Sequence, residues 1–522
     1  MLTLIREHRS FFLGTTLAGL ALRLFFFFHF PAVTDDSRIY ADLATNWLQH
    51  GIYGQTQGGH PEKQIILPTD ARLPGYPAFL AGIFWLFGAG NFRAVLLTQI
   101  LAGLATCLIV ADLARRAVSE CAARIAFVLA ALCPFLANYA AAELTETLEI
   151  FFTALALDGA VAALNRMHDA RAGIGILDRP SRKLWALTGA AIAACILLRP
   201  DGGILLAAVA LYLAVAAPKG ASDFEGRTAS LKRCPDTKLE SRRLCPDTKP
   251  KWKKRWLGTN PEFSRSLLVA GIIVVVFALA PLAPWTIRNF RTLHHFQPLA
   301  PRYANDTDEL VLRGFNRWVK TWIVDYVSVE EIYWNVPGDK IDPRKLPSRA
   351  LENPAERDAT LAVIADYDEP QDMTPELDAR FGKLAADRIR AHPIRYYVVL
   401  PVVRVADMWL RPRTEILPPD VRWWEFNDDA KHSFMAVGFG LLNLAYVGTA
   451  LLALVPRTSR RRSGIRWAGL FVGFLLLRSA FLGTLENPEP RYTLECYPVV
   501  ILWAAAYLGN ATEQQRQSES RF

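Results

Sequence analysis

The sequence predicts an all-α protein that crosses a membrane many times, and three observations carry this prediction. Of the 522 residues, 52% are hydrophobic and only 21% are charged, which is more apolar than an average soluble domain. The stretch 11–31 (FFLGTTLAGLALRLFFFFHFP) is about as long as the ~20 apolar residues that span a bilayer, and similar stretches follow it. Basic residues concentrate in some of the loops between these stretches. Disorder and collagen are excluded.

The net charge of +9, from 59 Lys and Arg against 50 Asp and Glu, does not indicate nucleic-acid binding. That function needs the basic charge on a folded soluble face, whereas most of the excess here lies in loop 218–265, with thirteen basic and six acidic residues. We therefore expect membrane lipid and no nucleic acid as a partner. The seven cysteines have neither a disulfide framework nor zinc-ligand spacing, so we expect thiols.

Apolar runs predict ten transmembrane helices. The first run is long and ends without a small-residue cleavage site, so we expect an uncleaved first span. The predicted spans are 11–31, 94–114, 121–139, 143–164, 184–198, 202–217, 267–287, 433–455, 465–484 and 493–509. Two further stretches, 73–90 and 391–411, are also long enough to cross. The first opens with Pro-Gly-Tyr-Pro, however, and the second contains Arg395, Arg404 and Asp407.

Loop charge predicts the orientation, because short loops rich in Lys and Arg stay cytoplasmic. Loops 165–183, 218–265 and 456–466 are strongly basic and should be inside, whereas segment 288–391 has fifteen basic and eighteen acidic residues and should be outside. These assignments agree with two cytoplasmic termini if 73–90 and 391–411 are juxtamembrane helices on the outer face. Within the predicted spans, charged side chains are costly and should form ion pairs. These residues are Arg23, Glu149, Asp158 and Arg478.

The chain thus divides into an N-terminal transmembrane module (1–290), an external soluble subdomain (291–391) and a C-terminal transmembrane module (392–522). The first module includes an external loop, 31–93. The external subdomain contains two helix-like stretches, 352–367 and 373–392. The cytoplasmic insertion 218–265 contains a tandem near-duplicate, LKRCPDTKLES and RRLCPDTKP, and its composition predicts disorder. Its cysteines, Cys234 and Cys245, lack partners at zinc spacing.

Two adjacent carboxylates, Asp35 and Asp36, follow the first span directly. Partial desolvation at a membrane face raises a carboxyl pKa, which suits a general base. The alternative is that one of them caps a helix over residues 37–50.

A second candidate, Arg72, precedes Pro74 and Pro77, which fix the chain where a lipid phosphate would lie. A guanidinium binds phosphate through two parallel hydrogen bonds. Arg199, Arg288 and Arg491 should also lie at outer ends of spans, against the usual charge bias, so the four arginines could line one anionic pocket. The alternative is local pairing, for example of Arg491 with Glu489.

The order of these motifs resembles a known class of enzymes. Asp36-x-x-x-Tyr40-x-x-x-Ala44 is followed by Arg-x-Pro-Gly-Tyr-Pro, and then by four later segments: LTETL at 144–148, LRPD at 198–201, PWTIRN at 284–289 and EPRY at 489–492. Together they resemble the C-type (GT-C fold) integral-membrane glycosyltransferases. Within this class, they most resemble the family that includes protein O-mannosyltransferases and the lipid A aminoarabinose transferase. This family is similar to glycosyltransferase family 39. This implies a GT-C-like bundle of about 10 (10–13) transmembrane helices with outer juxtamembrane helices and a large external loop.

The resemblance implies an inverting glycosyltransferase that moves a hexose or pentose from a polyprenyl-phosphate-linked donor to an acceptor at the outer face. The acceptor, a protein, a lipid or a glycan, is not specified. Asp36 aligns with the catalytic aspartate, and Asp35 would replace it if the alignment slipped by one residue. Glu146 matches a second acidic position, with Glu143 one helical turn earlier. Substrate-binding roles are implied for Arg72, Tyr40, Tyr76, Glu143, Arg199, Arg288, Arg491 and Tyr492.

No cofactor is certain from the resemblance, and a divalent cation is permitted but not expected. It also implies a plasma (inner) membrane location in a bacterium. The principal alternative is a multi-spanning transporter or flippase of lipid-linked glycans, which would carry an inverted internal repeat. The two halves of this sequence contain no such repeat. A scaffold acting through the external loop would leave the outer arginines unexplained.

Overall fold

The computed structural model describes residues 1–58, 65–170, 177–219, 261–305, 309–352, 354–426, 430–455 and 465–519. The predicted insertion, with its near-duplicate segments and Cys234 and Cys245, therefore lies almost entirely outside the described residues. The five described cysteines are free thiols, as expected.

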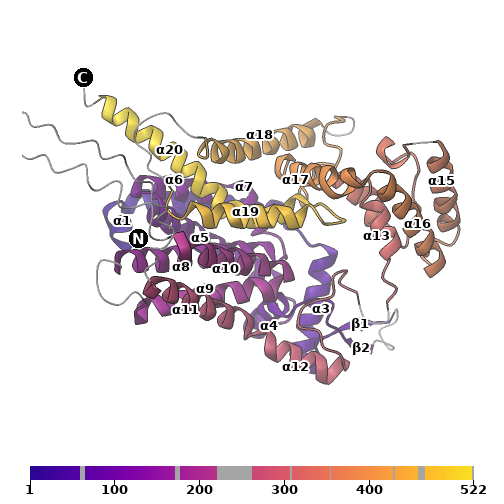
Figure 1. The fold of residues 1–522 in the computed structure, drawn as a ribbon, viewed down its shortest axis with the longest axis horizontal. Helices are drawn as coiled ribbons and strands as arrows, with labels where there is room; N and C mark the ends of the chain where they lie inside the picture. Colours follow the sequence, from indigo (N-terminus) through magenta and orange to yellow (C-terminus); the bar gives the residue numbers. More distant parts are fainter. Residues whose placement is uncertain are drawn as a thin grey trace, which may run out of the picture.

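Long helices form one bundle, and each predicted span coincides with helical structure (Figure 1). The bundle begins with the short α1 (Leu2–Glu7). Its long members are α2 (Arg9–His29), α5 (Phe92–Ala117), α8 (Glu146–Ala170), α9 (Arg179–Leu198), α10 (Gly203–Lys219), α11 (Pro261–Leu279), α18 (Ala430–Leu452), α19 (Ala468–Leu482) and α20 (Tyr497–Glu519). In the described part of the chain, six helices are long and apolar enough to cross a membrane. The protein is a polytopic helical membrane protein, and ten crossings stays a prediction.

Two of the predicted spans are not single helices, because each is interrupted at a proline. The span predicted at 121–139 is divided into α6 (Glu120–Ala131) and α7 (Pro134–Tyr139), because Pro134 supplies no N–H to the preceding turn and suits the first position of a new helix. Residues 267–287 divide in the same way into α11 and α12 (Leu282–Leu293), with Pro281 as the N-cap of α12.

Three of the four intramembrane charges form the expected ion pairs. Asp158 pairs with Arg116, Glu149 with Arg199, and Arg478 with Asp201. The prediction is wrong for Arg23, whose fully buried guanidinium donates to the carbonyl oxygens of Gly19 and Ala131. The helix break after α6 leaves carbonyl groups without intrahelical partners, and Arg23 satisfies one of them.

The first external loop, 31–93, which is predicted to lie outside, folds against the bundle. It consists of α3 (Asp35–His50), the antiparallel strands β1 (Gly54–Gln57) and β2 (Ile65–Pro68), and α4 (Gly75–Phe87). Thr34 caps α3 and forms a reciprocal pair of hydrogen bonds with Ser37, so the predicted capping by Asp35 or Asp36 is wrong. Both carboxylates stand in the first turn, where they interact favourably with the helix dipole.

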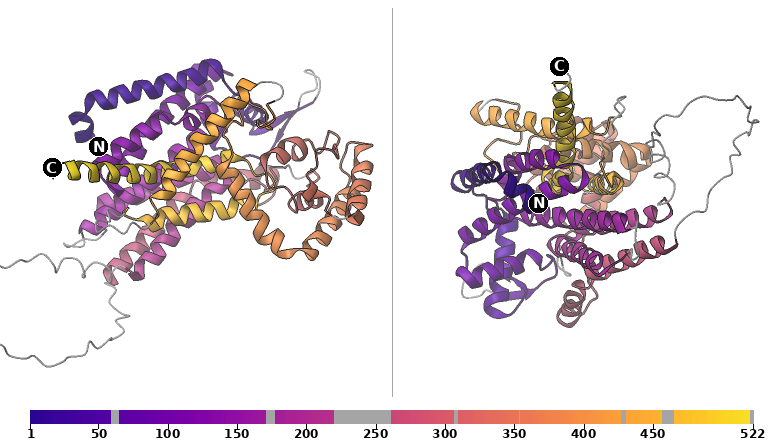
Figure 2. Two further views of the ribbon diagram at one scale, coloured as in Figure 1. Left: turned by 90° about the horizontal axis from the view of Figure 1, so that it is seen from above. Right: turned by 90° about the vertical axis from the view of Figure 1, so that its left-hand side faces the viewer.

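The second external region contains a small helical subdomain with its own apolar core. Its elements are α13 (Arg313–Val319), α14 (Tyr326–Ser328), η3 (Val329–Tyr333), η4 (Ser348–Ala350), α15 (Pro354–Asp368) and α16 (Pro375–Ala391), so both predicted helices in this region are present. The core includes Phe315, Trp318, Trp322, Tyr367 and Phe381. Figures 1 and 2 show α13, α15 and α16 at one end of the molecule, and α1 at the other.

Short elements connect this subdomain to the bundle. The chain returns to the bundle through η5 (Arg395–Val399) and α17 (Leu400–Leu410). Two further short helices lie at the ends of long ones: η2 (Pro200–Gly202) follows α9, and η6 (Pro490–Cys496) precedes α20. Buried Arg404 of α17 donates to the carbonyl oxygens of Ile323, at 2.7 Å, and Gly483, at 3.2 Å. One guanidinium thus holds the external subdomain against the outer end of α19.

Candidate active site

A cavity of about 1320 Å³ opens where the first external loop, the ends of the long helices and the external subdomain meet. Its walls carry both charged and aromatic side chains, and several come from the motifs that the sequence singled out. The lining includes Asp36, Tyr40, Arg72, Glu146, Arg199, Asp201, Tyr303, Trp334, Glu415, Glu489, Arg491 and Tyr492. Residues far apart in the chain therefore converge on one polar chamber.

Asp36, and not Asp35, faces the other charged groups of this cavity. Consecutive residues on a helix point about 100° apart, so the two carboxylates of α3 cannot face the same way. Asp35 has a 93% exposed side chain and pairs with Arg38. The Asp36 carboxylate lies 3.2 Å from Arg72 Nη2 and 3.5 Å from Arg491 Nη2. The sequence left the choice between these neighbours open. Both border the cavity, and the direction of the helix decides that Asp36 is the one that contacts its arginines.

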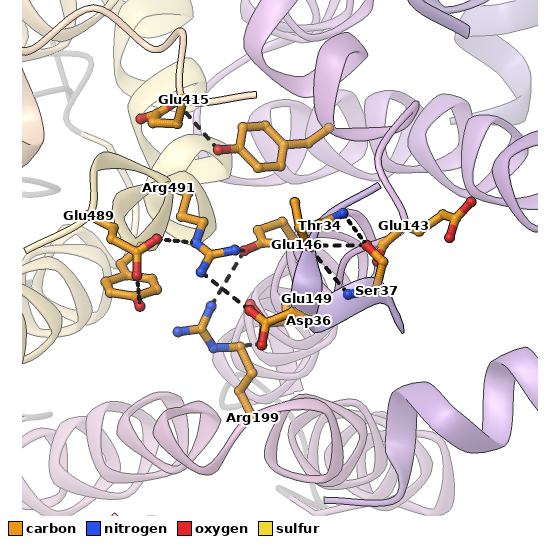
Figure 3. Close-up of polar contacts among 12 residues, drawn as sticks. Thr34, Asp36, Ser37, Glu143, Glu146, Glu149, Arg199, Glu415, Glu489 and Arg491 are labelled. Atoms are coloured by element: carbon orange, nitrogen blue, oxygen red, sulfur yellow. Dashed lines mark hydrogen bonds and ion pairs between the residues drawn. The ribbon is translucent and has the colours of Figure 1, made fainter. Parts of the chain in front are cut away.

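Three of the four predicted arginines gather at this site. Arg72 precedes α4 and also donates to the carbonyl oxygen of Ala304, which ties it to the second external region. Arg199, in the turn after α9, lies over the Tyr492 ring at 4.5 Å. Arg491 of η6 lies between the carboxylates of Glu489, Glu146 and Asp36 (Figure 3).

The ion pairs among these charges differ in their N–O distances. Arg491 Nε lies 2.6 Å from Glu489 Oε2, which confirms the pairing considered from the sequence. By contrast, the Glu146 carboxylate lies 3.7 Å from Arg491 and 3.5 Å from Arg199. Arg199 also lies 3.5 Å from both Glu149 and Asp201. These longer separations exceed the ~2.7–2.9 Å of a charge-assisted hydrogen bond.

The pKa of Asp36 is lowered from its ordinary value of 3.8. Burial alone would raise it, but the positive charges of Arg491 and Arg72, together with the Arg72 hydrogen bond, outweigh burial. Asp36 is therefore ionised at neutral pH, as a general base must be before it accepts a proton.

Three predicted site residues lie outside the cavity lining. Glu143 precedes α8 instead of lying on its face, and its side chain points away from Arg491 (Figure 3). Tyr76 is fully buried and donates to Gln99, although its ring also contacts Tyr40. Arg288 donates to the carbonyl oxygens of Thr69 and Tyr53 and holds the first external loop in place. Tyr40 and Tyr492 do line the cavity, as predicted.

A buried charge network lies beneath the cavity floor, and the sequence did not single it out as part of the site. Oxygen atoms of Glu149, Asp201 and Glu495 all lie within 4.8 Å of one another, which is a spacing that a cation could bridge. Arg478 already lies 2.8 Å from Asp201 and 2.7 Å from Glu495, so a guanidinium supplies positive charge there. The available signal was the charge of Glu149 and Arg478 within apolar runs.

Comparison with known proteins agrees with this fold. The chain resembles the apo oligosaccharyltransferase of Archaeoglobus fulgidus with a TM-score of 0.50 and 13% identity, covering 98% of this chain and 51% of that one. A second structure of this enzyme (AglB), in complex with an inhibitory peptide and a dolichol-phosphate, gives 0.49 and 11%, covering 99% and 52%. ArnT from Cupriavidus metallidurans bound to undecaprenyl phosphate gives 0.39 and 14%, covering 97% and 78%. No curated protein matches the sequence.

The arrangement of the helices defines the class of fold: the chain has the GT-C fold of integral-membrane glycosyltransferases. Within that class, residues 71–225 match the family model for dolichyl-phosphate-mannose-protein mannosyltransferases. The match begins at Ala71, beside Arg72, and includes Glu146 and Arg199. The chain spans about half the length of the oligosaccharyltransferase chains that it resembles.

Proposed function

We propose that this protein transfers a sugar from a polyprenyl-phosphate-linked donor to an acceptor at the outer face of the membrane, with inversion at the anomeric carbon. The observation that carries the proposal is the position of the Asp36 carboxylate between Arg72 and Arg491 in one outer cavity. A base and a cluster of positive charge are the two groups that this chemistry requires. The name of the matching family, which specifies a dolichyl-phosphate-linked donor, supports the same donor class.

In the proposed reaction, the acceptor oxygen attacks the anomeric carbon as the bond from that carbon to the phosphate oxygen breaks. The acceptor proton passes to the Asp36 carboxylate, and the bonding electron pair leaves with the polyprenyl phosphate. Arg72, Arg199 and Arg491 stabilise the phosphate as its negative charge develops. Glu146 orients Arg199 and Arg491, since its carboxylate lies between their guanidinium groups.

The proposed reaction requires no divalent cation. Arg72, Arg199 and Arg491 can together supply the positive charge that a metal ion provides in other phosphate-binding sites. The acceptor remains a protein, a lipid or a glycan in this proposal.

The proposed orientation places both termini in the cytoplasm and the cavity outside, in the inner membrane of a bacterium. The position of α1 and the C-terminal part of α20, at the end of the bundle opposite α13, α15 and α16, supports it (Figure 1). The excess acidic charge of segment 288–391 supports it as well.

The decisive experiment reconstitutes the full chain in proteoliposomes and supplies undecaprenyl-phosphate-linked hexoses and pentoses as donors. A bacterial membrane extract is the source of acceptors, and the release of undecaprenyl phosphate is measured. Asp36→Asn should lower the transfer rate by about 10²–10⁴-fold, the contribution typical of a general base. Asp35→Asn is the matched control and should retain the rate, because its carboxylate is exposed and pairs with Arg38. Full activity of a folded, membrane-inserted Asp36→Asn variant would refute the proposal.

A further inference from the structure

The arginines proposed to bind the donor phosphate are occupied by the protein's own carboxylates. Arg491 directs each of its three nitrogen atoms at a carboxylate: Nε at Glu489, Nη1 at Glu146 and Nη2 at Asp36. Arg72 directs Nη2 at Asp36 and Nη1 at two backbone carbonyl groups. A phosphate that enters this site must therefore displace or share some of these contacts.

Contact lengths indicate which contacts a phosphate displaces. Glu489 holds Arg491 through an ion pair at 2.6 Å, although Arg491 Nε makes no hydrogen bond among the described residues. Glu489 is itself buried and accepts a hydrogen bond from the Tyr492 hydroxyl. The separations of Arg491 from Asp36, at 3.5 Å, and from Glu146, at 3.7 Å, are longer and weaker. The second oxygen of Glu146 is buried without a hydrogen-bond partner among the described residues. Asp36 and Glu146 are thus the loosely held anions.

Exposure of the carboxylates separates Asp36 from the two glutamates, because the Glu146 side chain is only 3% exposed. The Asp36 side chain is 32% exposed, so it can leave its arginines toward the cavity at little desolvation cost, whereas the Glu489 side chain is only 4% exposed. Asp36 belongs to the first external loop, Arg72 precedes α4, and Arg491 belongs to η6. The exchange of partners therefore needs only side-chain movement within the cavity.

We propose that Asp36 is an internal counter-anion of the phosphate site: a lipid phosphate replaces its carboxylate on Arg491 and Arg72, and this exchange releases Asp36 to act as the base. Donor binding and base activation are then one event. Without a donor, Asp36 is held by two guanidinium groups and is a weak proton acceptor. The inference rests on the proposed function, because it takes Asp36 as the base and these arginines as the phosphate site.

The charges that face Asp36 support this coupling. Arg491, Arg72 and Arg199 lower its pKa in the unliganded protein, and Tyr40 and Glu146 lie beside the same arginines. A phosphate that binds the arginines adds a negative charge beside Asp36 and removes its hydrogen bond from Arg72, and both effects raise its proton affinity. The base becomes stronger only when a donor is in place.

The test measures binding of undecaprenyl phosphate, without a sugar or an acceptor, to the full chain in lipid nanodiscs at pH 7. Asp36→Asn should bind this lipid about two- to tenfold more tightly than the unaltered protein, because the competing carboxylate is gone and each loose ion pair is weak. Asp35→Asn should bind with unchanged affinity, and Arg491→Met should bind more weakly. Unchanged or weaker binding by Asp36→Asn would overturn the proposal.

A second variant keeps the test conclusive if Asp36→Asn does not fold. Asp36→Ser removes the same carboxylate with a smaller side chain and should also bind undecaprenyl phosphate more tightly, whereas unchanged or weaker binding by this variant would count against the exchange. Failure of this inference is distinct from failure of the proposed function. If Asp36→Asn loses sugar transfer but binds undecaprenyl phosphate no more tightly, only the exchange is refuted. If Asp36→Asn keeps full transfer activity, the role of Asp36 as the base is refuted.

Discussion

Arg491 Nη1 in η6 lies 3.7 Å from Glu146 Oε1, the first residue of α8. This contact joins the C-terminal membrane helices to the N-terminal half of the bundle at the floor of the cavity. The N-terminal half supplies Asp36, Glu146, Arg72 and Arg199, and the C-terminal half supplies Arg491. The site therefore depends on close packing of the two halves.

Arg491→Lys should raise the KM for the donor and lower the transfer rate by about ten- to a hundredfold. Lysine keeps the charge, but its single ammonium cannot face Glu489, Glu146 and Asp36 from three separate nitrogen atoms. Steady-state kinetics with varied donor concentration measures the effect. Arg166→Lys, at a surface pair with Asp178, is the control. An unchanged KM for Arg491→Lys would contradict the assigned role.

The acid limb of kcat should lie at higher pH than the acid limb of kcat/KM for the donor. The first reports the donor complex and the second reports the free enzyme, where the pKa of Asp36 is below 3.8. Because the bound phosphate raises that pKa, the complex loses its ionised base earlier as the pH falls. In pH profiles over pH 4 to pH 8, kcat/KM of the unaltered protein should stay flat on the acid side, while kcat should fall toward pH 4. Coincident limbs would show that donor binding leaves Asp36 unaffected.

Glu146→Gln should lower the transfer rate by about ten- to a hundredfold, because Arg199 and Arg491 lose the carboxylate between them. Glu143→Gln, three residues earlier, should leave the rate unchanged. Burial raises the pKa of Glu143 to about 7, so glutamine resembles the neutral form that is already populated at neutral pH. Comparing the two variants in the same transfer assay tests the assignment. Equal losses would indicate that both glutamates serve the site.

Arg478→Met should destabilise the folded protein by ~3–5 kcal/mol, the cost of leaving buried charges without a partner. Arg478 is fully buried, and its removal leaves Asp201 and Glu495 close together without their shared guanidinium. Thermal unfolding in detergent measures the change. The double variant Arg478→Met with Glu495→Gln should recover part of the loss. Wild-type melting of the single variant would show that the network contributes nothing to stability.

Local patterns predicted the helices well, because apolar length and loop charge act on short stretches of chain. The two outer helices near 354–368 and 375–391 were also predictable. The breaks at Pro134 and Pro281 were overlooked because a proline inside an apolar run does not lower its hydropathy enough to divide it. The partners of Arg23 were not predictable from the local pattern, because one is a carbonyl group of its own helix, at Gly19, and the other lies on α6, at Ala131.

The sequence by itself determined the class of fold, the long loops between the apolar runs and a set of candidate charges that includes Asp36, Arg72 and Arg491. Only the tertiary structure decided which candidates share a cavity, because membership depends on the direction of each side chain at its helix terminus. Asp35 and Asp36 are adjacent in sequence, yet α3 turns one toward solvent and the other toward two arginines. Arg288 and Arg72 were equal candidates for phosphate binding in the sequence. Arg288 donates hydrogen bonds to the backbone carbonyl groups of Thr69 and Tyr53, whereas Arg72 lines the cavity.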